Sequence, residues 1–193
     1  MSDDAPGPTA PGPTAPRTTA RSRAKADRRA TLLAEAARLF ARSGFDGVSM
    51  EDLGAAAGIS GPAVYRHFAS KQAVLAALLV AAALRGLVAF HTAFALAQPD
   101  VIRVQDRDLD ALAEADRRTV RGLQRAYVEA WVAVLARLDP DAPVGELRLR
   151  TQAMFGLLNS TPYSAQGHGA RGVPRGRVRA LLETMALAAL GHD

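Results

Sequence analysis

The sequence predicts an all-α protein with a small N-terminal unit of three helices and a larger helical unit behind it. Three observations support this fold class: alanine is abundant, aromatic residues make up only 5% of the chain, and apolar residues recur at helical spacing in most segments. Sheets are enriched in β-branched and aromatic residues, whereas small residues suit closely packed helices. A length of 193 residues fits one compact unit or a small module fused to a larger one.

Composition excludes several classes of protein. The chain has no cysteine, so it can form no disulfide, thiolate metal site or thiol nucleophile, and a reducing cytoplasm is the expected location. The longest apolar run, residues 73–84, ends at Arg85 and is shorter than the roughly 20 residues of a membrane span. We therefore expect a buried helix there. Asp3 and Asp4 begin an N-terminus that lacks the pattern of a secretory signal.

The positive charge is concentrated near the N-terminus. Residues 17–71 contain ten Lys and Arg against five Asp and Glu, which accounts for the whole net charge of +5, and the remainder of the chain is neutral. A basic segment beside a neutral body predicts an anionic partner, with DNA, RNA and an acidic membrane all open at this point.

The first elements follow from local signals. Residues 1–22 repeat Pro, Gly, Thr and Ala and predict a disordered basic arm, which could contact DNA or add only nonspecific attraction. A helix then carries apolar residues at helical spacing and stops at Gly44. Its apolar positions are Leu32, Leu33, Ala36, Leu39 and Phe40.

Residues 49–67 have the proportions of a helix-turn-helix. Ser49 and Asp52 predict a capping box for a helix over 50–57, and Gly58 permits the turn into a second short helix that Ser60 caps and that reaches about residue 67. The expected core is Leu53, Ala56, Ile59, Val64 and Phe68. The residues expected to face solvent or DNA are Ser60, Gly61, Ala63, Tyr65, Arg66 and His67.

Longer helices are predicted beyond this motif. They cover 70–97, 114–138, 144–160 and 174–190. An irregular connection that has room for one helical turn is expected at 100–112, and a glycine-rich loop before the last helix. Lys71 lies in the first turn of a helix, where the macrodipole disfavours a cation unless an anion such as a DNA phosphate is present. A solvated surface lysine is the alternative interpretation.

Residues 29–79 resemble the N-terminal domain of the tetracycline-repressor (TetR) family of bacterial regulators. The resemblance is carried by ARLFARSGFDGVSMEDL (37–53), AGISGPAVYRHF (57–68) and SKQAVL (70–75). It implies an all-helical homodimer that binds a palindromic DNA operator, with a DNA-binding domain at 23–70 and an effector-binding and dimerisation domain at 71–193. The last two long helices would form the dimer interface. Residues at phosphate-contacting positions are Ser49, Tyr65, His67 and Lys71, and those near bases are Ser60, Gly61, Ala63 and Arg66. Pro62 departs from the Thr or Ala often seen beside that glycine.

The larger domain is expected to bind a small effector. Its candidate residues, each of which also suits a plain core or an exposed loop, are Phe90, Phe94, Arg103, Gln105, Tyr127, Trp131, Phe155 and Asn159. Residues 102–109 and 155–162 are similar to stretches of actinobacterial family members linked to fatty-acid, sterol or acyl-CoA catabolism. That similarity makes an acyl-CoA or another lipid metabolite the hypothetical effector.

The expected function is a repressor that a small effector releases from DNA, and other functions fit the sequence less well. An enzyme is not expected, because the G-x-G-x-x-G at 167–172 follows no predicted strand and no catalytic set is visible. No metal or cofactor is expected either: the four histidines are far apart, and the aspartates at 106, 108 and 110 lack the glycine and glutamate of a calcium loop. An architectural DNA-binding protein without an effector remains the alternative, and no helix has the basic and aromatic faces of a membrane-surface protein.

Overall fold

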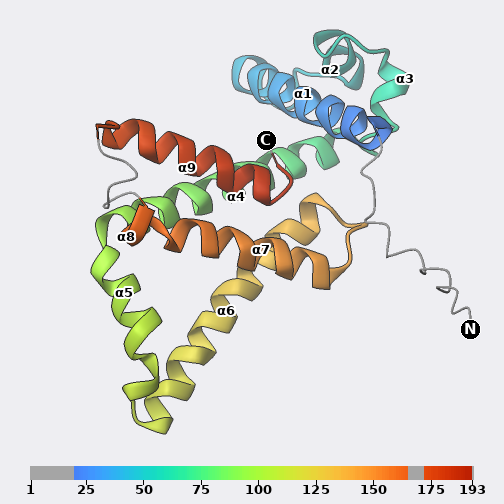
Figure 1. Ribbon diagram of the computed structural model, residues 1–193. Helices are drawn as coiled ribbons and strands as arrows, with labels where there is room; N and C mark the ends of the chain where they lie inside the picture. The colour runs from blue at the N-terminus through green and yellow to red at the C-terminus, as the bar shows by residue number, and fades with distance from the viewer. Residues whose placement is uncertain (1–19, 165–171, 193) are drawn as a thin grey trace, which may run out of the picture. The chain divides into compact units, whose positions relative to one another are not determined.

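The computed structural model describes residues 20–164 and 172–192, which contain helices and turns but no strand, so the all-α prediction is confirmed (Figure 1). The chain divides into two compact units, Met1–Ser70 and Lys71–Asp193. Residues 1–19 of the predicted arm lie outside the described residues. For residues 20–22 the prediction of a disordered arm was wrong, since they form the first turn of a helix.

The first unit contains three helices: α1 (Ala20–Ser43), α2 (Met50–Ala56) and α3 (Gly61–Val64). As predicted, α1 ends at Gly44, whose φ is +72° and whose N–H donates to the Phe40 carbonyl at 2.9 Å. The predicted capping box starts α2, since Asp52 N donates to Ser49 Oγ at 3.1 Å and Ser49 N donates to Asp52 Oδ2 at 2.8 Å. Helix α3 is shorter than predicted and continues to residue 68 as hydrogen-bonded turns.

The core of the first unit partly matches the prediction. Leu53, Val64 and Phe68 are buried, Ile59 is half-buried, and Ala56 is exposed. The expectation for Ala56 was therefore wrong, and its neighbour Ala57 is buried instead.

Ala63 was also wrongly predicted to face outward. It is only 7% exposed, because the short α3 packs closely against α2 and its small side chain lies in that contact.

Six helices and one short 3₁₀ turn form the described part of the second unit. They are α4 (Lys71–Ala97), α5 (Pro99–Asp108), η1 (Leu109–Ala111), α6 (Glu114–Leu138), α7 (Val144–Asn159), α8 (Thr161–Ser164) and α9 (Arg175–Ala189). The prediction of an irregular connection at 100–112 was wrong. Pro99 is tolerated in the first turn of a helix, and Asp100 and Arg107 lie at the ends that the macrodipole favours, so α5 forms there. The predicted glycine-rich loop falls mostly at 165–171, outside the described residues.

Helix α4 packs against α6, α7 and α9 and forms the centre of the second unit. By length and hydropathy it is also the one helix among the described residues that could cross a membrane. Its buried side includes His91 and Thr92 as well as apolar residues, and this side contacts other helices of the unit. We therefore interpret α4 as a helix that contributes one side to the core of the unit. The expectation of a buried helix over 73–84 was only partly right, because most of this run is exposed or half-buried and Leu79 is 61% exposed. The largest fully buried side chains around α4 are Leu84, Val88, Trp131, Leu135, Leu147, Met154, Leu158 and Leu190.

The turn between α2 and α3 depends on a glycine. A Cβ on Gly54 would lie 2.8 Å from the Ile59 carbonyl oxygen and 3.0 Å from the Gly61 nitrogen. We expect Gly54→Ala to lower the free energy of unfolding by about 1 to 3 kcal/mol, because backbone atoms must move apart. Gly86→Ala on α4 is the matched control, since nothing lies within 4 Å of its Cβ, and a gain of up to about 1 kcal/mol is expected there. Urea unfolding of both variants measures the difference, and equal stability would contradict the proposed clash.

Candidate DNA-binding and effector sites

The end of α3 presents most of the predicted DNA-contacting residues. Tyr65 is 52% exposed, Ser60 and Arg66 are exposed, and Gly61 and His67 are half-buried. Ser60 precedes α3 but its hydroxyl makes no capping hydrogen bond to the helix. These side chains are therefore accessible on one short segment, whereas the buried Ala63 is not.

Ser49 has a structural role in the described conformation. Its hydroxyl donates to Asp52 Oδ2 at 2.7 Å and accepts from the Asp52 N–H, and these bonds hold the pKa of the Asp52 carboxyl below its usual value. The side chain is nevertheless exposed at the start of α2, where orphan helix amides attract anions. A phosphate contact of Ser49 would thus share a hydroxyl that already stabilises the helix.

Arg29 is a residue of this site that the sequence analysis assigned only to a basic stretch. Its Nη1 donates to the His67 carbonyl at 3.0 Å, and its guanidinium carbon lies 4.2 Å from the centre of the Phe68 ring. These contacts attach the end of the α3 segment to α1. The signal that could have found it is its place in the basic run just before the apolar positions of the helix.

His67 lies in a positive environment. Partial burial lowers its pKa, and the charges of Lys25, Arg29, Arg66 and Arg28 lower it further. Lys71 is the first residue of α4 and belongs to the second unit; its side chain is half-buried. The basic character that the sequence predicted for the first unit is thus present at the side chains around His67.

Five of the eight predicted effector residues form a single cluster in the second unit. The ring of His91 is in contact with four aromatic rings, at centroid distances of 4.8 Å to Phe155, 5.9 Å to Tyr127 and 6.2 Å to both Phe94 and Trp131. Asn159 Oδ1 lies 3.1 Å from His91 Nε2. The cluster therefore joins α4, α6 and α7 through aromatic packing with a polar centre.

His91 is the residue at that centre which the sequence analysis did not select. It is 8% exposed, and the Tyr127 hydroxyl lies 3.3 Å from its Nδ1. A neutral ring with its proton on Nε2 can donate a hydrogen bond to Asn159 and accept one from Tyr127. Burial lowers the pKa of His91, and the hydrogen bond to Asn159 opposes this shift. Burial likewise raises the pKa of Tyr127, an effect that the nearby Trp131 N–H partly offsets. Its helical spacing from the buried Leu84 and Val88 is the signal that could have found His91.

The other three predicted effector residues lie apart from this cluster. Phe90 is 67% exposed, and Gln105 is exposed on α5. Arg103 donates to Asp100 Oδ1 and to the Pro162 carbonyl, both at 2.7 Å, and so connects α5 with α8. Arg107, on the same helix as Arg103, pairs with Asp108 through two hydrogen bonds of 2.7 Å.

Together, a three-helix unit with a helix-turn-helix and a larger helical unit define the class of DNA-binding transcription regulators. Two family models match consecutive segments of the chain: bacterial regulatory proteins of the tetR family at residues 32–78, and the tetracyclin repressor-like C-terminal domain at residues 79–169. The chain belongs to the TetR family. It is a transcriptional regulator that binds DNA, and not an enzyme.

Solved structures of the same family are similar to this chain at low identity. A TetR-family regulator from Bordetella parapertussis is 26% identical, with 85% of this chain and 94% of that chain covered and a TM-score of 0.45. PfmR from Thermus thermophilus is 22% identical, with coverages of 83% and 97% and a TM-score of 0.41. The ketosteroid regulator KstR2 of Mycobacterium tuberculosis is 19% identical, with coverages of 85% and 93% and a TM-score of 0.43. No curated protein matches the chain.

The lowered pKa of His91 predicts a pH-dependent stability. In the unfolded chain this histidine titrates near its usual 6.5, so below that pH the unfolded state binds more protons than the folded state. The free energy of unfolding should therefore fall as the pH is lowered from about 7 to about 5. Trp131 is the only tryptophan and contacts His91, so its fluorescence reports urea unfolding at this place. His91→Gln should flatten the pH dependence, and an unchanged slope in that variant would assign the effect to other groups.

Proposed function

We propose that this regulator is a repressor that binds a palindromic operator as a homodimer and is released by a small effector bound in the cluster around His91. The observation that carries the proposal is the polar trio of His91, Tyr127 and Asn159 enclosed by aromatic rings on α4, α6 and α7. An apolar site with a few convergent polar groups is typical of small-molecule binding. We therefore favour an effector-responsive regulator over an architectural DNA-binding protein.

DNA contact is proposed for the accessible residues of the first unit and the start of α4. Tyr65, His67, Ser49 and Lys71 are assigned to phosphates, and Ser60, Gly61 and Arg66 to base edges. The exposure of Tyr65 and Arg66 and the positive charges around His67 support this assignment. Ala63 is left out because it is buried.

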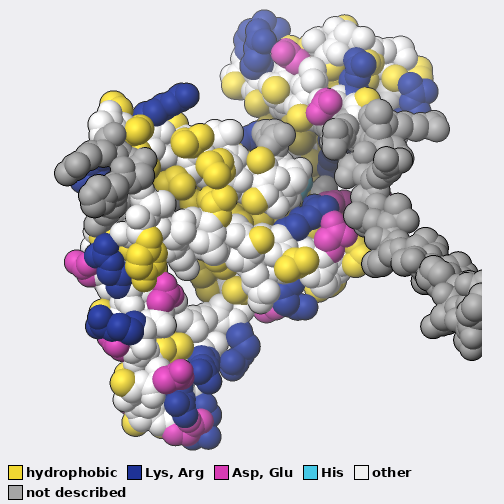
Figure 2. Space-filling model, in the orientation of Figure 1, with side chains coloured by type: hydrophobic (Ala, Val, Ile, Leu, Met, Phe, Trp, Pro, Cys, Tyr) yellow, Lys and Arg dark blue, Asp and Glu magenta, His cyan; other side chains and the backbone are white. Residues whose placement is uncertain are grey.

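The proposed dimer interface is the outer side of α7 and α9. Exposed small or apolar residues follow one face of each helix, and Figure 2 shows hydrophobic side chains gathered over this region. They are Gly145, Leu149, Ala153 and Gly156 on α7, and Ala180, Leu181, Met185 and Ala188 on α9. Small residues allow helices to approach closely, and Leu149 at 66% and Leu181 at 53% exposure would gain from burial. Two symmetric copies would place recognition helices about 34 to 36 Å apart on a palindrome.

Helix α4 is the proposed connection between ligand and DNA. It carries His91 and Phe94 in the cluster, and its first residue directly follows the first unit in the chain. A ligand that inserts among these rings must displace α4 or its neighbours, which changes the separation of the two recognition helices. An effector that prefers the released state by about 3 kcal/mol would weaken operator binding about 150-fold. An acyl-CoA or another lipid metabolite suits the apolar lining of the cluster.

Selection of random duplexes by the purified protein tests the proposed function. We expect enrichment of a palindrome with half-sites one helical turn apart. Addition of the effector should release that duplex, and an acyl-CoA is the first probe. Tyr65→Ala and Lys71→Ala should each weaken binding to all duplexes alike, because a phosphate contact is lost. In the Lys71 variant the affinity for DNA should also depend less steeply on salt concentration, because one positive charge is removed. Arg38→Ala on α1 is the control, since that side chain is 78% exposed and pairs with Glu35. Absence of any enriched sequence would contradict the proposal.

The proposed interface predicts a monomeric variant. Leu181→Asp places a charge on the exposed face of α9 and should halve the mass measured by light scattering at micromolar concentration, because two buried carboxylates would face each other across the symmetry axis. Leu123→Asp on α6 is the matched control, since Leu123 is 67% exposed but lies outside α7 and α9. If both variants keep the mass of the parent protein, the interface lies elsewhere.

A further inference from the structure

An open groove lies along the outside of α6 and α7, away from the residues of the effector cluster. Its volume is about 380 Å³, within the lower range of small-molecule sites. The side chains that line it are Arg121, Gln124, Arg125, Val128, Glu129, Arg148 and Gln152. Three guanidinium groups and two carboxamides thus surround a single carboxylate.

The one carboxylate of the groove is already neutralised. Glu129 accepts two hydrogen bonds from Arg148, of 2.7 Å and 3.0 Å, which hold the pKa of Glu129 below its usual value. This bidentate pair connects α6 with α7 and fixes the orientation of the Arg148 guanidinium. The remaining N–H groups of Arg148 stay available to a second oxyanion.

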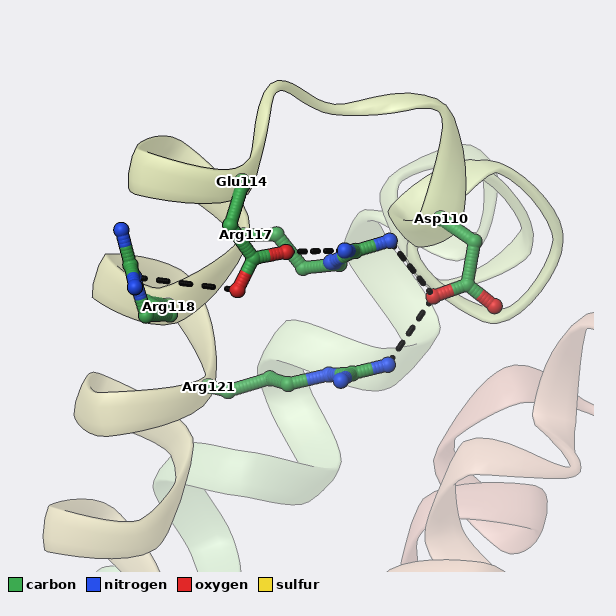
Figure 3. A network of polar contacts seen from close by, with 5 residues as sticks. All are labelled: Asp110, Glu114, Arg117, Arg118 and Arg121. Carbon is green, nitrogen blue, oxygen red and sulfur yellow. Dashed lines mark hydrogen bonds and ion pairs between the residues drawn. The ribbon is translucent and has the colours of Figure 1, made fainter.

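The other two arginines leave an excess of positive charge. Asp110 lies 2.9 Å from Arg121 and 3.8 Å from Arg117, so the two arginines share this carboxylate (Figure 3). Glu114 in turn pairs with Arg117 and Arg118. Arg125 is exposed and forms no ion pair or hydrogen bond within the described part of the chain. With Glu129 and Arg148 included, five arginines face three carboxylates, so two positive charges have no counterpart in this network.

We propose that this groove is an anion site for an organic diphosphate, a ligand with at least two negative charges on adjacent phosphate groups. Each guanidinium presents a fork of N–H donors that matches a phosphate, and the two glutamines add neutral donors. The volume exceeds what one phosphate fills, which leaves room for an organic group beside the apolar Val128. The bound diphosphate bridges Arg121 and Arg125 of α6 to Arg148 of α7.

This site is separate from the proposed effector cluster, although both include residues of α6 and α7. Val128 and Glu129 in the groove neighbour Tyr127 of the cluster in sequence, and Gln152 precedes Phe155 by one helical turn. A ligand that bridges α6 and α7 therefore stabilises the helix pair on which the aromatic rings are mounted. We expect this ligand to raise the midpoint of unfolding of the protein. The effect does not require that the chain also binds an effector.

Calorimetry at low ionic strength tests the site with pyrophosphate, ADP and citrate as probes. We expect pyrophosphate or ADP to bind with 1:1 stoichiometry per chain and more tightly than citrate, and binding to weaken as salt is raised. Tighter binding of ADP than of pyrophosphate supports an organic diphosphate, and the reverse order contradicts the organic part of the proposal. Arg125→Gln and Arg121→Gln should each weaken the interaction about tenfold, because a charge-assisted contact is lost.

Arg118→Gln is the matched control, since Arg118 belongs to the same helix and network but does not line the groove. Its affinity for the diphosphate should change less than about twofold. Circular dichroism verifies that each variant keeps its helices. The proposal is overturned if no diphosphate binds, if the Arg118 variant loses as much affinity as the Arg125 variant, or if citrate binds as tightly as the phosphates. It is also overturned if Arg125→Gln weakens duplex binding as strongly, since the groove would then be a nucleic-acid contact.

Discussion

The second unit depends on the burial of one side of α4 against α6, α7 and α9. This packing places His91 between four aromatic rings and brings Tyr127 and Asn159, which are far apart in the sequence, to its two ring nitrogens. Because α4 begins at the residue that follows the first unit, this helix is the direct covalent connection between the two units. The packing of α4 therefore both stabilises the second unit and assembles the cluster around His91.

Polar atoms inside this core cost free energy unless they form hydrogen bonds. Besides the trio around His91, the buried Thr92 hydroxyl and the Trp131 N–H form no hydrogen bond of normal geometry in the described part of the chain. An unsatisfied buried polar group costs about 1 to 3 kcal/mol, which an apolar residue of similar shape would avoid.

Charge is organised differently in the two units. In the first unit, partial burial lowers the pKa of His67, and the charges of the basic side chains around it lower it further. In the second unit, most arginines near α6 are paired with carboxylates across short distances. The unbalanced charge of the first unit suits a long-range attraction to the DNA backbone, whereas the groove on α6 and α7 carries a local excess of positive charge.

The sequence by itself determined the fold class and most helix limits, because these depend on local signals. The capping box at Ser49, the glycine at position 44 and the bounds of α6 could all be read from neighbouring residues. Tertiary packing decided the rest: the helix at 99–108, the burial of Ala63, the central place of His91 and the groove shared by α6 and α7. Helical periodicity shows which face of a helix is apolar, but not which other helix will cover it. Contacts between residues as distant as His91 and Asn159 therefore exist only once the chain has packed.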